Sequence, residues 1–180
     1  DSAVTFIKPG ETLKASDINL TVKGADGRGA LTVNGGVQYQ GKPVKLAATI
    51  ENLSRLTGKD GSAATLALTI PGGDIRFEGT VQQAKAIAAS GTLDVAMRDI
   101  PNTLQWATGK AAGASIPTQL DLNTSLNVKS KQYTLKNTKL EVDGLETAGD
   151  ITANLEGTVP AISGTLKFGM LDLNKLMKTP

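Results

Sequence analysis

The side chains of this chain that could carry out chemistry are mostly carboxylates. Aspartates recur along the sequence, and such residues can bind calcium or pair as general acid and base. Their spacing matches no metal-binding loop, and aspartate is common at turns and on the solvent-facing side of strands. We therefore expect structural roles for these residues, which are Asp94, Asp99, Asp121, Asp143, Asp150 and Asp172.

Two residue types that dominate catalytic and metal sites do not occur in the sequence. The chain contains no histidine, the commonest general base and metal ligand, and no cysteine, so disulfides and thiolate chemistry are excluded. The glycine-rich stretch 24–29 lacks the lysine and the strand-to-helix context of a phosphate-binding loop, and we interpret it as a turn. The sequence therefore predicts a protein that is not an enzyme, with no catalytic residues, no metal and no cofactor.

Length and charge narrow the class of protein further. The chain has 180 residues, which suits a single domain over residues 1–180, and it contains no apolar run long enough to span a membrane. Its formal net charge is +2, and its lysines and arginines are spread along the chain. Aromatic residues make up only 3% of the sequence, so a basic stripe interleaved with aromatics is absent. We expect no nucleic-acid partner.

Nearly every segment alternates apolar and polar residues with a period of two, which is typical of strands with one buried and one solvated face. Turns rich in glycine, proline and aspartate separate these segments. The pattern predicts a mainly β protein of about twelve strands, arranged as a repetitive antiparallel meander that forms a curved or grooved sheet. The expected strands lie around residues 4–6, 18–22, 31–39, 44–50, 64–70, 75–81, 93–97, 120–128, 133–135, 140–142, 151–155 and 162–170.

A few short helices should interrupt the meander. The alternation breaks at residues 51–56 and again in the closing stretch 171–177, which both suit a helical turn. The strongest helix candidate covers residues 99–106, because Asp99 can cap it and Pro101 suits its first turn. Leu104 and Trp106 of this helix are candidates for a lid that folds back on the sheet, although Trp106 could instead contact a partner or a membrane.

Three segments of the chain share one repeated unit. Each has a strand that begins near a glycine, then Gly-Thr-Leu or a comparable hairpin, then a short leucine-bearing helical turn. The units start at Gly29, Gly73 and Gly149, and two of them contain Gly-Asp-Ile followed by Gly-Thr-Val. Repeats of this size indicate an extended sheet in which each unit covers the apolar edge of its neighbour.

These motifs resemble the C-terminal region of the AsmA family of Gram-negative envelope proteins. The most similar stretches are residues 64–81 and residues 149–177 with their Leu-Asp-Leu-Asn ending, and the likeness extends from about Ser16 to Met177. The resemblance implies a domain at the periplasmic face of the inner membrane, from a longer protein whose membrane anchor lies outside these residues. It also implies a role in outer-membrane assembly and lipid homeostasis, since larger relatives form β grooves with an apolar interior that carry phospholipid.

The alternating apolar residues could therefore line a lipid-binding groove, because a sheet with one uncovered apolar face can shelter acyl chains. The same residues could equally pack on the short helices or on a second sheet, and the sequence favours this covered arrangement because most apolar faces in soluble domains are covered. The lipid-facing candidates are Leu66, Leu68, Ile75, Phe77, Leu93, Val95, Leu120, Leu122, Leu126, Leu166 and Phe168.

Two functional hypotheses follow. In the first, the domain holds or passes phospholipid along an apolar β groove. In the second, it is a scaffold that recruits an envelope protein through exposed strand edges and binds no lipid. An uncovered apolar trough would favour the first hypothesis, and a closed core with an exposed edge strand would favour the second. Open sheet ends would also make the chain self-associate by strand pairing.

Overall fold

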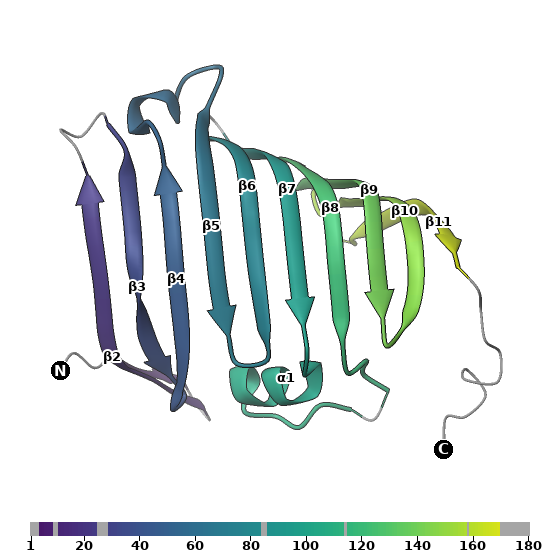
Figure 1. The fold of residues 1–180 in the computed structure, drawn as a ribbon, viewed down its shortest axis with the longest axis horizontal. Coiled ribbons are helices and arrows are strands. Elements are labelled where there is room, and N and C mark those ends of the chain that lie inside the picture. Colours follow the sequence, from purple (N-terminus) through teal and green to yellow (C-terminus); the bar gives the residue numbers. More distant parts are fainter. Residues whose placement is uncertain are drawn as a thin grey trace.

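A computed structural model describes residues 4–8, 11–24, 29–83, 86–113, 115–157 and 159–169 of the chain. Eleven strands form one antiparallel sheet, and their order in the sheet is their order in the sequence. Figure 1 shows this meander as a single layer of strands. The strands are β1 Val4–Lys8, β2 Glu11–Gly24, β3 Leu31–Tyr39, β4 Lys42–Ile50, β5 Ser62–Ile70, β6 Gly73–Gln83, β7 Ile87–Met97, β8 Leu120–Lys129, β9 Gln132–Val142, β10 Leu145–Asn154 and β11 Ala161–Phe168.

The mainly β fold predicted from the sequence, an antiparallel meander with few helices, is confirmed. Tight turns join many of the strands. Gln40 and Gly41 between β3 and β4, like Asp143 and Gly144 between β9 and β10, have positive φ angles at both central positions. Turns of this kind match the right-handed twist of the strands that they connect. They fix the register of each hairpin, and hence the face on which each side chain lies.

Three irregularities interrupt the regular pairing. The register shifts between Ser16 and Asn19 in β2, between Asn123 and Ser125 in β8, and between Gly149 and Ile151 in β10. Residue Asn137 of β9, which lies opposite the latter two shifts, has a φ angle of 51°. The sequence predicted two short strands at 133–135 and 140–142, and this prediction is wrong: one strand, β9, runs through the irregularity.

The sheet has no second layer among the residues that the structure describes. Among these residues, Ala64 has the only buried apolar side chain, with 8% of its surface exposed. The chain exposes 12421 Å² of surface, whereas a compact globular protein of this mass exposes about 8,200 Å². Both faces of the sheet therefore contact solvent, and the covered arrangement favoured by the sequence is not what the described residues adopt.

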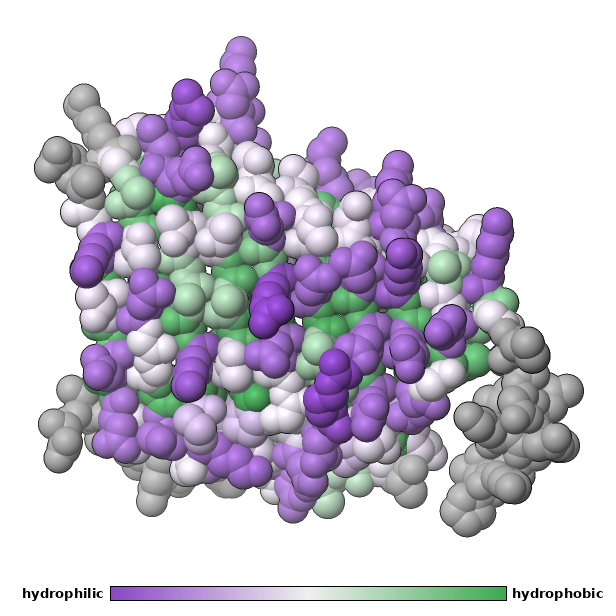
Figure 2. All heavy atoms as spheres, in the orientation of Figure 1, coloured by the Kyte–Doolittle hydropathy of each residue, from purple (hydrophilic) through white to green (hydrophobic). Residues whose placement is uncertain are grey.

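The two faces of the sheet differ sharply in chemistry. On one face, charged and other polar residues alternate with small ones, and in Figure 2 the hydrophilic residues are spread in purple over the face that points towards the viewer. We call this side the polar face. In Figure 1, seen from the same side, β11 lies behind β9 and β10. At this end the sheet curves away from its polar face, and the opposite face lies on the inner side of the curve.

Two of the three predicted helical segments are present, and the third, residues 171–177, lies outside the described residues. Helix α1 spans Ile100–Thr108, with Asp99 as its N-cap, and η1 is a short 3-10 helix at Leu53–Arg55. Figure 1 shows α1 below the ends of β5 to β7. Thr103 Oγ1 donates a hydrogen bond to the carbonyl of Pro71, which lies between β5 and β6. The helix therefore lies at one end of the sheet.

The cap of α1 makes a pH-dependent contribution to its stability. The hydrogen bonds that the side-chain amide and the backbone N–H of Asn102 donate to Asp99 lower the pKa of this carboxyl below its ordinary value of 3.8. A lowered pKa means that the stabilising contribution is present above pH 3.8 and is lost as the pH falls through the folded-state pKa. We expect an NMR titration of Asp99 to have its midpoint below 3.8.

The control for this titration is Asn102→Ala, which removes the side-chain donor and keeps the backbone donor. The midpoint of Asp99 should then move back towards 3.8. A wild-type midpoint at or above the ordinary value would contradict the assigned cap.

Candidate functional site

The strand register gathers the alternating apolar residues on the face opposite the polar face, which we call the apolar face. Residues that pair directly across antiparallel strands point to the same side of a sheet. One unbroken row of such pairs crosses ten strands, from β2 to β11, and only its glycine and its threonine are not large apolar residues. This row consists of Leu20, Gly35, Leu46, Leu68, Ile75, Val95, Leu122, Leu140, Thr147 and Phe168.

Parallel rows on both sides extend the apolar face. The next row joins Val22, Val33, Ala48, Leu66, Phe77 and Leu93. Another joins Leu31, Ile50, Ala64, Gly79, Gly91, Leu126, Leu135 and Ile151. Rows two residues apart are separated by about 7 Å and neighbouring strands by about 4.8 Å, so the face is about 40 Å wide across the strands.

All of the lipid-facing candidates named from the sequence lie on this one face. Leu68, Ile75, Val95, Leu122 and Phe168 belong to the first row, and the remaining candidates lie in the adjoining rows. Those are Leu66, Phe77, Leu93, Leu120, Leu126 and Leu166. Four further residues, which were expected in strands but not among the lipid-facing candidates, lie on the same face. They are Leu46, Leu135, Leu140 and Ile151.

The apolar side chains are shielded from solvent only by their neighbours on the same face of the sheet. In the centre of the sheet Leu66, Leu68, Ile75 and Phe77 are all half-buried, and none is fully buried. Exposure rises towards the two ends of the sheet, to 63% for Val22 on β2 and 53% for Phe168 on β11. An apolar surface of this extent is unusual for a monomer in water, and it commonly marks a site of interaction.

A small polar cluster interrupts the apolar face near β8 and β9. The hydroxyl oxygens of Thr124 and Thr138 lie 2.8 Å apart, and both residues are 1% exposed. Thr124 Oγ1 also donates to the carbonyl of Lys136. The buried hydroxyls are thus satisfied within the protein, as burial of a polar group requires. The register shift in β8 brings this pair together, and no sequence pattern indicated it.

A pair of glycines lets the strands approach closely on the apolar face. Gly79 of β6 lies opposite Gly91 of β7, and both come from the repeated Gly-Thr units. A Cβ atom on Gly79 would lie 2.1 Å from the carbonyl oxygen of Ser90, and one on Gly91 would lie 2.2 Å from that of Glu78. Only glycine fits at such a distance from a neighbouring backbone. A side chain at either position would collide with the backbone of the neighbouring strand, so this part of the repeat requires glycine.

Helix α1 carries the two lid candidates. Trp106 Nε1 donates a hydrogen bond of 2.7 Å to the carbonyl of Tyr39, and the two rings meet edge-on with centroids 5.4 Å apart. Leu104 is 37% exposed. Tyr39 is the last residue of β3, so Trp106 fastens the helix to the end of a distant hairpin.

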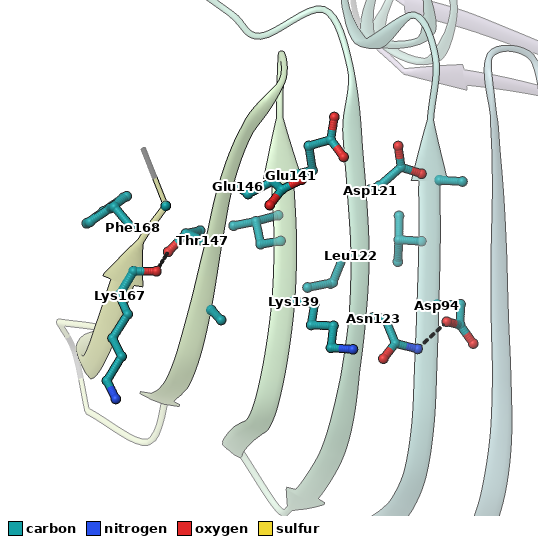
Figure 3. Close-up of a pocket in the computed structure, with 15 residues that line it drawn as sticks. Asp94, Asp121, Leu122, Asn123, Lys139, Glu141, Glu146, Thr147, Lys167 and Phe168 are labelled. Atoms are coloured by element: carbon teal, nitrogen blue, oxygen red, sulfur yellow. Dashed lines mark hydrogen bonds between the residues drawn. The ribbon is translucent and has the colours of Figure 1, made fainter. Parts of the chain in front are cut away.

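A hollow crosses the polar face of the sheet. It has a volume of about 680 Å³ and crosses β7 to β11. Figure 3 shows two lines of polar side chains along it, one with Asp94, Asn123 and Lys139 and the other with Asp121, Glu141 and Glu146. The residues between these lines point to the other face, so their backbone forms the floor. We call this hollow the polar groove.

The aspartates that the sequence analysis singled out hold the fold together locally. Asn123 Nδ2 donates to Asp94, Arg98 forms an ion pair with Asp121, and the backbone N–H of Asn137 donates to Asp150. Asp143 accepts hydrogen bonds from the backbone N–H groups of Thr118 and Gln119. The hydrogen bond and the charge of Asp121 raise the pKa of Arg98. Asp172 lies outside the described residues.

Metal-binding and membrane-spanning features are absent from the part of the chain that the structure describes. No group of three or more acidic residues there is arranged to hold a metal ion. No helix in the same residues is long and apolar enough to cross a membrane. Comparison of the chain with family models, with curated proteins and with solved structures finds no match.

The glycine pair gives a direct test of the packing on the apolar face. We expect Gly79→Ala to lower the free energy of unfolding by about 1–3 kcal/mol, because the new methyl group must displace the backbone of β7. Urea unfolding followed by circular dichroism measures the change.

Gly113→Ala is the matched control, since no atom lies within 4 Å of a Cβ at that position. Its unfolding free energy should stay close to that of the wild type. An equally small effect of Gly79→Ala would contradict the close approach of β6 and β7.

Proposed function

We propose that this chain is a non-enzymatic periplasmic domain of an AsmA-like inner-membrane protein, and that its apolar face holds or passes phospholipid. The observation that carries the proposal is the uncovered apolar face of a one-layer sheet. Leu68 and its row partners Leu46 and Ile75 stand in the middle of that face, with only neighbouring side chains beside them. A soluble domain gains nothing from such a face unless a partner covers it.

Acyl chains are suitable partners for a surface of this kind. Burial of hydrocarbon stabilises a complex by about 0.8 kcal/mol for each CH₂ group removed from water, and the gain is not directional. A broad face of similar apolar side chains offers many nearly equivalent positions, which suits an acyl chain that must bind and still move along the sheet. The resemblance to AsmA proteins, carried by the three glycine-rich repeats, supports the same assignment and the periplasmic location. The membrane anchor would lie outside these residues.

A scaffold that recruits an envelope protein is the second candidate. It is favoured by the outer edge of β11, where no strand pairs among the described residues. An unpaired edge can accept a strand from another protein through backbone hydrogen bonds. In this alternative, the apolar face would be covered by the recruited protein and would bind no lipid.

Native mass spectrometry after incubation with vesicles of phosphatidylethanolamine and phosphatidylglycerol distinguishes the two candidates. We expect the wild-type chain to carry a phospholipid adduct, and Leu68→Asp to lose it because a charge in the central row opposes acyl-chain burial. Phe168→Asp should also weaken the adduct. It changes a side chain that is already 53% exposed, so its folding should be little affected.

Ala67→Asp is the matched control, because it places the same charge one residue away on the polar face of the same strand. This variant should bind phospholipid as the wild type does, and circular dichroism should show all variants folded. A wild-type chain that takes up no lipid, or equal binding by Leu68→Asp and Ala67→Asp, would refute the lipid-binding proposal and favour the scaffold.

A further inference from the structure

The two outer edges of the sheet are not equivalent. At one end, β1 pairs with residues Glu11–Ala15 of β2 and covers that part of its edge. The remainder of β2 is interrupted by the register shift after Ser16, where Asp17 has a φ angle of 50°. At the other end, β11 pairs with β10 over its whole length and without a shift. Its outer edge therefore presents a straight row of backbone groups with no pairing partner among the described strands.

Strand β11 also lacks the features that usually protect an edge. Natural sheets block their edges with proline, bulges or several charged residues. Residues 161–168 contain no proline, and Lys167 is their only charged residue. On the apolar face of this strand, Ile162 is 74% exposed and Phe168 is 53% exposed. Such an edge is suited to pairing with another strand of the same kind.

We propose that β11 pairs antiparallel with β11 of a second copy of this chain. The two copies are related by a two-fold axis that is normal to the sheet and passes midway between their Thr165 residues. Directly paired residues must share a face, so the apolar residues Ile162, Gly164, Leu166 and Phe168 can pair only among themselves. With Thr165 opposite Thr165 of the second copy, Ile162 lies opposite Phe168 and Gly164 lies opposite Leu166.

This register is selected by the side chains at the edge. A slip of two residues in one direction moves Phe168 beyond the end of the facing strand, and a slip in the other direction leaves Ile162 without a facing residue in that strand. The central register covers both of the large exposed side chains at once. Lys167 then faces Ser163, so no like charges oppose each other. The two-fold axis also keeps the two apolar faces on the same side, and they merge into one continuous surface.

Cysteine cross-linking tests the register directly, because the chain has no cysteine of its own. Thr165→Cys places two thiols opposite each other on the polar face, within reach of a disulfide or a short bifunctional maleimide. We expect a covalent dimer as the main product on a non-reducing gel. Ser163→Cys is the matched control, since Ser163 faces Lys167 and the two thiols would be about 13 Å apart along the strands. It should run as a monomer on the same non-reducing gel, because the two thiols are too far apart to be cross-linked.

Sedimentation velocity over a range of concentrations measures the pairing without cross-linking. The wild-type chain should shift from monomer to dimer as concentration rises. Thr165→Lys should weaken the dimer, because it places two like charges opposite each other at the axis. Thr92→Lys, on the polar face of the interior strand β7, should leave it unchanged. A chain that stays monomeric at every concentration, cross-linking of Ser163→Cys as strong as that of Thr165→Cys, or equal effects of the two lysines would each overturn the proposal.

Discussion

The antiparallel ladder is the constraint on which the rest of this structure depends. Because side chains alternate between faces and strands pair in sequence order, each apolar residue is placed by its register with its partner. The row from Leu20 to Phe168 continues across the sheet because no register shift interrupts the pairing of neighbouring strands at these residues. The turns at Gln40–Gly41 and Asp143–Gly144 are thus as important to the apolar face as the leucines that make it up.

A single layer of strands leaves the apolar side chains of one face only partly buried. In a sandwich, two sheets bury each other's apolar sides, but here the half-buried side chains of Leu66 and Phe77 have no opposing layer among the described residues. Fully burying a side chain of this kind is worth about 1.5–3 kcal/mol, so part of that gain is still available to a ligand.

The polar groove and the apolar face lie on opposite sides of the same strands. Asp94, Asn123 and Lys139 pair across neighbouring strands on one side, while Val95, Leu122 and Leu140 pair on the other. The charged side chains thus lie on the face opposite the one for which we propose lipid contacts. Helix α1 is fastened at the strand ends through Trp106 and Tyr39.

Much of this arrangement could be predicted from the sequence. The alternation with a period of two predicted the strands and the shared face of residues such as Leu68, Ile75 and Phe168. The capping signal at Asp99 predicted helix α1. The irregularities could not be predicted in the same way. The continuous strand β9 passes through Asn137 in a left-handed conformation, and the buried pair of Thr124 and Thr138 depends on a register shift, so both follow from pairing between strands and not from local pattern. Alternation also cannot reveal whether a second layer covers an apolar face, because a covered and an open face have the same sequence.

The central claim is that acyl chains bind on the apolar face, and methyl NMR with a phospholipid that carries a nitroxide on its acyl chain tests it most directly. The claim predicts that the spin label broadens the methyl signals of Leu68 and Leu122 more strongly than those of Ala67 and Ala96, on the polar face, because the broadening falls steeply with distance from the nitroxide. Equal broadening on both faces, or none on the apolar face, would contradict it.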